Sequence, residues 1–200
     1  MLSRRAAIVA GGAFAVWPAL AQTARPRVTL TTALGAIDLE LATDKAPITA
    51  NNFLAYVDKK RLDGSNFYRA MKLAADPLSG LIQGGLQGDP TKVFPTIAHE
   101  PTTKTGLLHK DGVISLARFA PGTATCDFFI CVGDQPFLDA DPSQSGDNQG
   151  FAAFGHVVSG MEVVKKILLA SVSPTAGEGV MKGQMLDPQI AILAARRSAG

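Results

Sequence analysis

The three histidines are the first side chains to examine for acid–base or metal chemistry. His99, His109 and His156 are scattered along the chain, and no pair of them has the spacing of metal ligands. Isolated histidines of this kind are more often turn or surface residues than ligands. The glycine run 84–88 lacks the lysine and serine or threonine of a phosphate-binding loop, and is expected to be a tight bend in a β fold. No Gly-x-Ser-x-Gly motif is present. We therefore expect no metal, no cofactor and no pair of nucleophile and base.

The only two cysteines, Cys126 and Cys131, flank Asp-Phe-Phe-Ile, which is expected to be a strand. At about 3.3 Å per residue they would lie roughly 16 Å apart and on opposite faces. A disulfide needs Cα atoms within roughly 7 Å of each other. The spacing therefore predicts two buried free thiols that serve in packing.

Six short motifs follow one another along the chain without an obvious nucleophile. They are Asn66-Phe67-Tyr68-Arg69, Leu81-Ile82-Gln83-Gly84-Gly85, Gly112 to Arg118, Asp127-Phe128-Phe129-Ile130, Pro136-Phe137-Leu138-Asp139 and Phe151 to Gly155. The segments 34–41 and 46–53 precede them. In order and spacing, these segments resemble the cyclophilin family of peptidyl-prolyl cis/trans isomerases, in its bacterial exported form, from about Thr29 to Ile192.

This resemblance implies an eight-stranded antiparallel β-barrel closed by two helices, with a shallow proline-binding groove on its outside. It also implies roles for individual residues. Arg69 is similar to the catalytic arginine. The substrate-binding residues implied are Leu81, Gln83, Ala117, Arg118, Asp127, Phe129, Phe137, Leu138 and Phe151. Among them, the backbone of Ala117 and Arg118 is expected to pair with the peptide.

The expected chemistry is rotation about the peptide bond before proline. The barrier to that rotation is about 18–20 kcal/mol, and uncatalysed exchange takes tens of seconds or longer. No covalent bond breaks, so no nucleophile is needed. A guanidinium aimed at the twisted amide would stabilise it over the planar form, while Leu81, Phe129 and Leu138 hold the proline ring.

The chain departs from the family pattern beside the expected groove. The link 70–82 is longer than usual, and Gly80 replaces an aromatic residue that walls the proline pocket. Leu73 or Leu78 from this link is a candidate to fill that gap. Asp127 replaces a glutamine, and its carboxylate could pair with the catalytic arginine or compete for it. Arg118 and Phe119 replace smaller residues. These departures leave open a reduced or altered isomerase activity.

Hydrophobic periodicity predicts the elements that would position these residues. Twelve prolines and twenty glycines favour short strands and many turns. Residues 28–41 alternate around Ala33-Leu34-Gly35, which predicts a hairpin. Residues 44–60 predict a helix, with Asp44 as a possible cap and Pro47 near its start. Further strands are expected at 66–71, 81–83, 112–117, 127–132, 151–158 and around 190–192, with a second helix at 161–170 and long loops at 70–79 and 140–149. Pattern alone leaves antiparallel barrel and sandwich open.

The first 21 residues have the composition of a signal peptide. Arg4 and Arg5 precede an apolar stretch that is short for a membrane span, and Ala19-Leu20-Ala21 fits a cleavage site. We expect residues 22–200 to form the isomerase domain, in the periplasm or secreted. The Sec and twin-arginine routes both stay open, and the alternative is a retained N-terminal anchor.

Charge argues against two classes of partner. The chain has 19 basic and 17 acidic residues, and residues 1–21 hold two arginines and no acid, which leaves 17 of each. A neutral domain offers no electrostatic surface for nucleic acid or anionic lipid. The expected partners are proline-containing polypeptide segments. We expect no association with the membrane once the signal peptide is removed, and a monomer is the default expectation.

The sequence thus predicts an isomerase that assists the folding of exported proteins. The alternative is a non-catalytic module or chaperone that holds proline-containing segments in the same groove. A hydrolase on a β scaffold is disfavoured, since no pair of nucleophile and base is evident.

Overall fold

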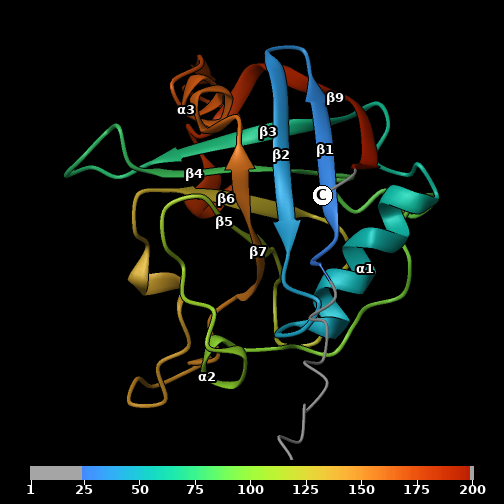
Figure 1. The fold of residues 1–200 in the computed structure, drawn as a ribbon. Coiled ribbons are helices and arrows are strands. Elements are labelled where there is room, and N and C mark those ends of the chain that lie inside the picture. Colours follow the sequence, from blue (N-terminus) through green and yellow to red (C-terminus); the bar gives the residue numbers. More distant parts are fainter. Residues whose placement is uncertain (1–23, 199–200) are drawn as a thin grey trace, which may run out of the picture.

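The computed structural model describes residues 24–198, so the predicted signal peptide, residues 1–21, lies outside the described residues. Eight strands form a closed antiparallel barrel in the order β1-β2-β7-β5-β6-β4-β3-β9, because β9 also pairs with β1. The short strand β8 pairs with β9 outside this ring. Figure 1 shows the strands wrapped around one interior. The bounds are β1 Arg27–Thr32, β2 Gly35–Leu41, β3 Ser65–Lys72, β4 Gly80–Gly85, β5 Val113–Leu116, β6 Phe128–Val132, β7 Ala152–Ser159, β8 Val172–Ser173 and β9 Met185–Ser198.

The predicted barrel of eight strands is confirmed, and so is its first hairpin. Strand β1 pairs with β2 around the turn at Ala33 and Leu34. Alternate residues of both strands, among them Leu30 and Ile37, are fully buried. Period-two alternation therefore sends one face of the hairpin into the barrel, as the sequence pattern predicts.

Two longer helices cover the barrel, at different ends in Figure 1: α1 (Pro47–Asp58) and α3 (Met161–Leu168). A four-residue helix, α2 (Thr102–Thr105), and two 3₁₀ turns, η1 (Pro136–Leu138) and η2 (Gly179–Met181), lie in the connections. None of the helices within residues 24–198 combines the length and the apolar character that crossing a membrane requires.

The N-terminus of α1 differs from the sequence prediction in how it is capped. The cap position is Ala46, which has no side-chain hydrogen bond, and Asp44 instead forms an ion pair with Arg25 at 2.9 Å. The cap comes from a distant carboxylate, Glu100, which is 2% exposed. Its Oε2 accepts hydrogen bonds from the backbone N–H and hydroxyl of Thr49 at 2.8 and 2.7 Å. A negative charge at a helix N-terminus also interacts favourably with the helix dipole.

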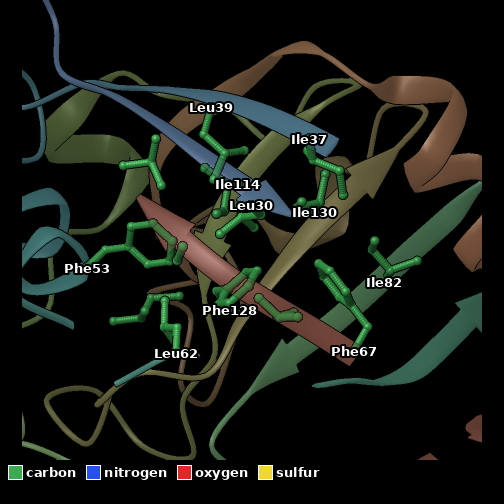
Figure 2. Packing of buried hydrophobic residues seen from close by; sticks show 14 of the residues in the cluster. Leu30, Ile37, Leu39, Phe53, Leu62, Phe67, Ile82, Ile114, Phe128 and Ile130 are labelled. Carbon is green, nitrogen blue, oxygen red and sulfur yellow. The ribbon is translucent and has the colours of Figure 1, made fainter. Parts of the chain in front are cut away.

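The barrel interior is filled by aromatic and branched aliphatic side chains. The Phe128 ring makes edge contacts with Phe53 of α1 and Phe67 of β3, with ring centroids 5.4 and 5.7 Å apart. Figure 2 shows these rings together with Ile82 and Ile130 inside the barrel. This core fixes β3, β4 and β6 against one another, and these three strands carry the candidate site on their outer faces.

Both cysteines are buried free thiols, as predicted. The glycine run is different from the prediction, because Gly84 and Gly85 belong to strand β4 and the bend follows them at residues 86–89. A Cβ on Gly84 would lie 2.9 Å from the Asn66 backbone oxygen of the neighbouring strand. These glycines therefore allow close approach of backbones, not only a change of direction.

Candidate functional site

A groove of about 580 Å³ runs over the outer face of the barrel. Its floor comes from the adjacent strands β3, β4 and β6, and its walls from the segment after β5 and from η2 and β9. Neighbours in one strand face opposite ways: Phe128 and Ile82 belong to the barrel core, whereas Phe129 and Leu81 belong to a second apolar cluster on the outside. The strand register therefore brings the outward side chains of distant motifs together.

Nine of the ten site residues predicted from the sequence line this groove. They are Arg69, Leu81, Gln83, Ala117, Arg118, Asp127, Phe129, Leu138 and Phe151. The remaining one, Phe137, is 60% exposed and lines a neighbouring hollow. Residues 136–138 form the one-turn helix η1, which turns Leu138 towards the groove floor and leaves Phe137 facing solvent.

Arg69 is held by two glutamines. Its Nε donates a hydrogen bond to Gln184 Oε1 at 2.9 Å, and its Nη1 donates one to Gln83 Oε1 at 2.8 Å. No group within residues 24–198 accepts a hydrogen bond from its Nη2. Partial burial lowers the pKa of Arg69 from its ordinary value, because desolvation disfavours the charged form. The guanidinium is thus fixed in direction and keeps donors for a ligand in the groove.

Tyr68 fixes the other end of this chain of hydrogen bonds. Gln83 Nε2 donates to the Tyr68 hydroxyl oxygen at 2.7 Å, which orients the Gln83 amide oxygen towards Arg69. Burial raises the pKa of Tyr68 well above its ordinary value, so the phenol stays neutral. Gln184 and the role of Tyr68 were missed from the sequence. Tyr68 stands in the Phe-x-Arg motif, but Gln184 is 115 residues from Arg69 and belongs to no motif.

The apolar part of the groove lies beside Arg69. Leu81, Phe129 and Leu138 form one buried cluster, against which Met71, Ala117 and Phe151 pack. The Phe151 ring meets the Phe129 ring edge-on, with centroids 5.4 Å apart. The cluster is an apolar cup with a cationic group at its edge, which suits a ligand that is part ring and part amide.

Gly80 occupies the start of β4 with φ of +151°. A Cβ there would collide with the backbone oxygen of Met71, so no larger side chain fits this position. Leu73 and Leu78, the candidates to fill the gap left by the missing aromatic residue, do not line the groove, and Leu78 is 66% exposed. Met71 and Met185 line the groove from β3 and β9 instead. Flexible methionine side chains therefore occupy this part of the wall.

Asp127 lines the groove but does not pair with Arg69. Its Oδ1 accepts a hydrogen bond from the backbone N–H of Gln87 at 2.9 Å. The carboxylate packs against Gly85, where any Cβ would collide with it. Burial raises the pKa of Asp127 above its ordinary value. Asp127 thus fixes the turn after β4 and leaves the guanidinium to its two glutamines.

Arg118 has a buried side chain that is paired with an acid, although its motif suggests a peptide-binding position. Its side chain is 4% exposed and forms an ion pair with Asp147. Its Nε donates to the carbonyl of Gly150 at 2.8 Å, and its guanidinium carbon lies 5.2 Å from the centre of the Phe151 ring. The loop 140–149, predicted from its composition, is tied to the groove wall through the ion pair of Asp147 with Arg118.

The backbone at this wall is partly unpaired. The Ala117 N–H donates to the Asp127 carbonyl at 2.7 Å. Within residues 24–198, the N–H and the carbonyl of Arg118 take no part in backbone hydrogen bonds. The N–H and C=O of one residue point to the same side of an extended strand, so these two groups can form a short antiparallel ladder with an extended peptide, at one of the two positions expected from the resemblance.

A buried Ser–His–Asp chain corrects the prediction that no nucleophile and base are paired. His109 is 1% exposed, with Nδ1 2.7 Å from Asp139 Oδ1 and Nε2 2.9 Å from Ser115 Oγ. Burial lowers the pKa of His109 despite the neighbouring carboxylate, so the ring is neutral. Ser115 is fully buried and does not line the groove, so it reaches no substrate. The His109 ring instead stacks on Phe129, with centroids 5.8 Å apart, and supports the groove floor.

The other two histidines are separate from this chain. His99 is partly exposed and its Nε2 lies 3.0 Å from the carbonyl oxygen of Gln149, while His156 lies in β7. In the part of the chain that the structure describes, no three His, Cys, Asp or Glu side chains are grouped as metal ligands.

Comparisons with known proteins place these features among relatives. Residues 27–190 match the family model described as cyclophilin type peptidyl-prolyl cis-trans isomerase/CLD. A peptidyl-prolyl cis-trans isomerase of Acinetobacter baylyi is 38% identical over 189 residues, covering 92% of this chain and 91% of the relative. Peptidyl-prolyl cis-trans isomerase A of Dickeya dadantii is 37% identical over 154 residues, covering 75% of each.

A solved structure supports the fold. The crystal structure of a Cryptosporidium parvum cyclophilin type peptidyl-prolyl cis-trans isomerase, obtained in the presence of the dipeptide Ala-Pro, superposes with a TM-score of 0.69. The match covers 87% of this chain and 99% of that one, at 20% sequence identity.

Proposed function

Because the chain belongs to the cyclophilin-type peptidyl-prolyl cis-trans isomerases, we propose that the groove around Arg69 is where it acts on its substrates. The protein is an isomerase of Xaa-Pro peptide bonds, and its substrates are proline-containing peptides. The observation that carries the assignment is the guanidinium of Arg69, fixed by Gln83 and Gln184 beside the apolar cup.

The mechanism follows from what a twisted amide needs. When the peptide bond rotates out of plane, resonance is lost and the proline nitrogen becomes a hydrogen-bond acceptor. A guanidinium donor near this nitrogen stabilises the twisted state more than the planar one, which lowers the barrier. The proline ring would sit on Leu81, Phe129 and Leu138, and the open backbone groups of Arg118 would hold the preceding residues.

Exchange kinetics test this assignment. Cis-to-trans exchange of an Ala-Pro peptide would be measured by NMR exchange spectroscopy with residues 22–200, Arg69→Ala and Arg27→Ala. Arg27 is the matched control, because it is a partly exposed arginine on β1 that pairs with Glu40. We expect Arg69→Ala to lose most of the catalysed exchange, at least about a hundredfold for a group that acts in the transition state, and Arg27→Ala to keep it.

The same experiment separates the alternative, a module that only holds proline-containing segments. In that case the peptide would shift the resonances of groove residues without faster exchange, in wild type and in Arg69→Ala alike. Equal catalysis by wild type and Arg69→Ala would overturn the role of Arg69.

We further propose that the protein is exported and assists the folding of exported proteins as a monomer. The support is the composition of residues 1–21, with two arginines, an apolar stretch and Ala19-Leu20-Ala21. Mass analysis of the protein from fractionated bacterial cells would test this. A soluble periplasmic form beginning at Gln22 is expected, whereas a full-length form in the membrane fraction would indicate a retained anchor.

A further inference from the structure

The two most exposed large apolar side chains within residues 24–198 both line the groove. Phe119 is 93% exposed and Val180 is 85% exposed, while the next, Leu78, is 66% exposed and lies elsewhere. Single exposed apolar residues are common on protein surfaces. Two of them at the rim of one substrate groove, where the floor is also apolar, indicate a contact surface.

The order of strands places these two side chains on opposite walls. The sheet runs β5-β6-β4-β3-β9 through this region, and β6, β4 and β3 form the floor. Phe119 follows β5 on one side. Val180 lies in η2, just before β9, on the other side. A peptide lying along the floor passes between them.

The wall that carries Phe119 is a tight, hydrogen-bonded turn. The Phe119 N–H donates to Thr123 Oγ1 at 3.1 Å, and the Thr123 hydroxyl donates to the Ala120 carbonyl at 2.8 Å. The Phe119 carbonyl in turn accepts from Arg118 Nη1 at 3.1 Å. The backbone below the exposed ring is therefore fixed, so contact with a peptide orders little more than the ring itself.

The opposite wall is fixed in a similar way. Around Val180, the Met181 N–H donates to the Glu178 carbonyl at 3.0 Å and the Gly183 N–H donates to the Ala176 carbonyl at 2.9 Å. The same turn ends at Gln184, whose N–H donates to the Met181 carbonyl at 3.1 Å and whose side chain holds Arg69. The exposed valine is thus built on the segment that positions the guanidinium.

We propose that Phe119 and Val180 determine substrate preference, by gripping a large apolar side chain on a residue next to the proline. This proposal rests on the proposed site around Arg69. Arg118, the charged residue next to Phe119, is paired with Asp147, so it offers no free charge to an ionic neighbour on this wall. The preferred clients are therefore unfolded segments in which proline adjoins leucine, phenylalanine or another large apolar residue, as in chains whose core is still exposed.

Two peptide series test the proposal. In Ala-Xaa-Pro-Ala and Ala-Ala-Pro-Xaa, Xaa is Gly, Glu, Leu or Phe, and kcat/KM is measured by NMR exchange for wild type, Phe119→Ala and Val180→Ala. We expect wild type to favour Leu and Phe over Gly in at least one series. Each variant should lose about fivefold on the Leu peptide, as expected for about 40 Å² of apolar contact, and stay within about twofold of wild type on the Gly peptide.

Controls separate this effect from a general loss of structure or activity. Leu193→Ala removes an apolar side chain that is 56% exposed on β9 and lies outside the groove, and should keep the wild-type preference. Phe119→Leu retains an apolar contact and should restore most of the preference. An unchanged ratio of Leu to Gly rates in both alanine variants, or an equal fall on all peptides, would overturn the proposal while leaving the isomerase site intact. Failure of wild type to accelerate any peptide would instead count against the proposed site itself.

Discussion

Replacement of Gln184 by alanine is the sharpest test of how the groove directs its arginine. Arg69 has two side-chain hydrogen bonds, to Gln184 at 2.9 Å and to Gln83 at 2.8 Å. Gln184 is not expected to touch the substrate amide, so it is a positioning residue. The variant removes one of the two bonds that fix the guanidinium and leaves the apolar cup unchanged.

The expected effect can be sized from that bond. A hydrogen bond that involves a charged group contributes about 1.5–3 kcal/mol. If about 1.4 kcal/mol of this is lost from the orientation of Arg69 in the transition state, kcat falls about tenfold. The KM for an Ala-Pro peptide should hardly change, because the proline ring binds to Leu81, Phe129 and Leu138. Full exchange kinetics over a range of peptide concentrations separate the two constants.

A double-mutant cycle between Arg69 and Gln184 tests whether Gln184 acts through the guanidinium. In an Arg69→Lys background, Gln184→Ala should add little, because an ammonium has no Nε donor for Gln184 Oε1. The variant Gln184→Glu keeps the acceptor oxygen and should retain more activity than Gln184→Ala. If Gln184→Ala slowed the wild-type enzyme and the Arg69→Lys variant by the same factor, or raised KM with kcat unchanged, Gln184 would not act through the guanidinium.

Three further changes test other parts of the structure. Tyr68→Phe frees the Gln83 amide and should lower kcat about threefold to tenfold in the exchange assay, with the fold retained by circular dichroism. Burial raises the pKa of Asp127 above its ordinary value of 3.8, so ionisation of this carboxyl destabilises the folded state at higher pH. Asp127→Asn should therefore raise the thermal unfolding midpoint at pH 7. The gain should shrink as the pH falls towards 3.8, where the carboxyl is protonated in the folded protein. Glu100→Ala removes the cap of α1 and should lower the free energy of unfolding by about 2–3 kcal/mol in urea titrations, with kcat/KM of the folded enzyme unchanged.

Much of the site could be predicted because its residues come in motifs on short strands. Alternation along β6 separates Phe128, which packs in the core, from Phe129, which faces the groove. The same rule separates Ile82 from Leu81 and Gln83 on β4. Once a motif is assigned to a strand, the side of the sheet for each residue follows from the period of two. The direction of the Phe137 side chain could not be predicted in this way, because its motif lies in the 3₁₀ turn η1, where alternation does not apply.

The sequence by itself determined the order of the motifs, the family resemblance that implies the barrel, and the groove residues carried by strands. Only the tertiary structure decided which side chains act on one another across the chain. Gln184 binds Arg69 although the two are 115 residues apart in the sequence, and Glu100 caps α1 through Thr49, which is 51 residues away. Ser115, His109 and Asp139 form one buried chain of hydrogen bonds. Each contact depends on barrel closure and on the course of loops without motifs. The physical reason is that local patterns fix the direction of a side chain, whereas its hydrogen-bond partner is fixed by distance in space.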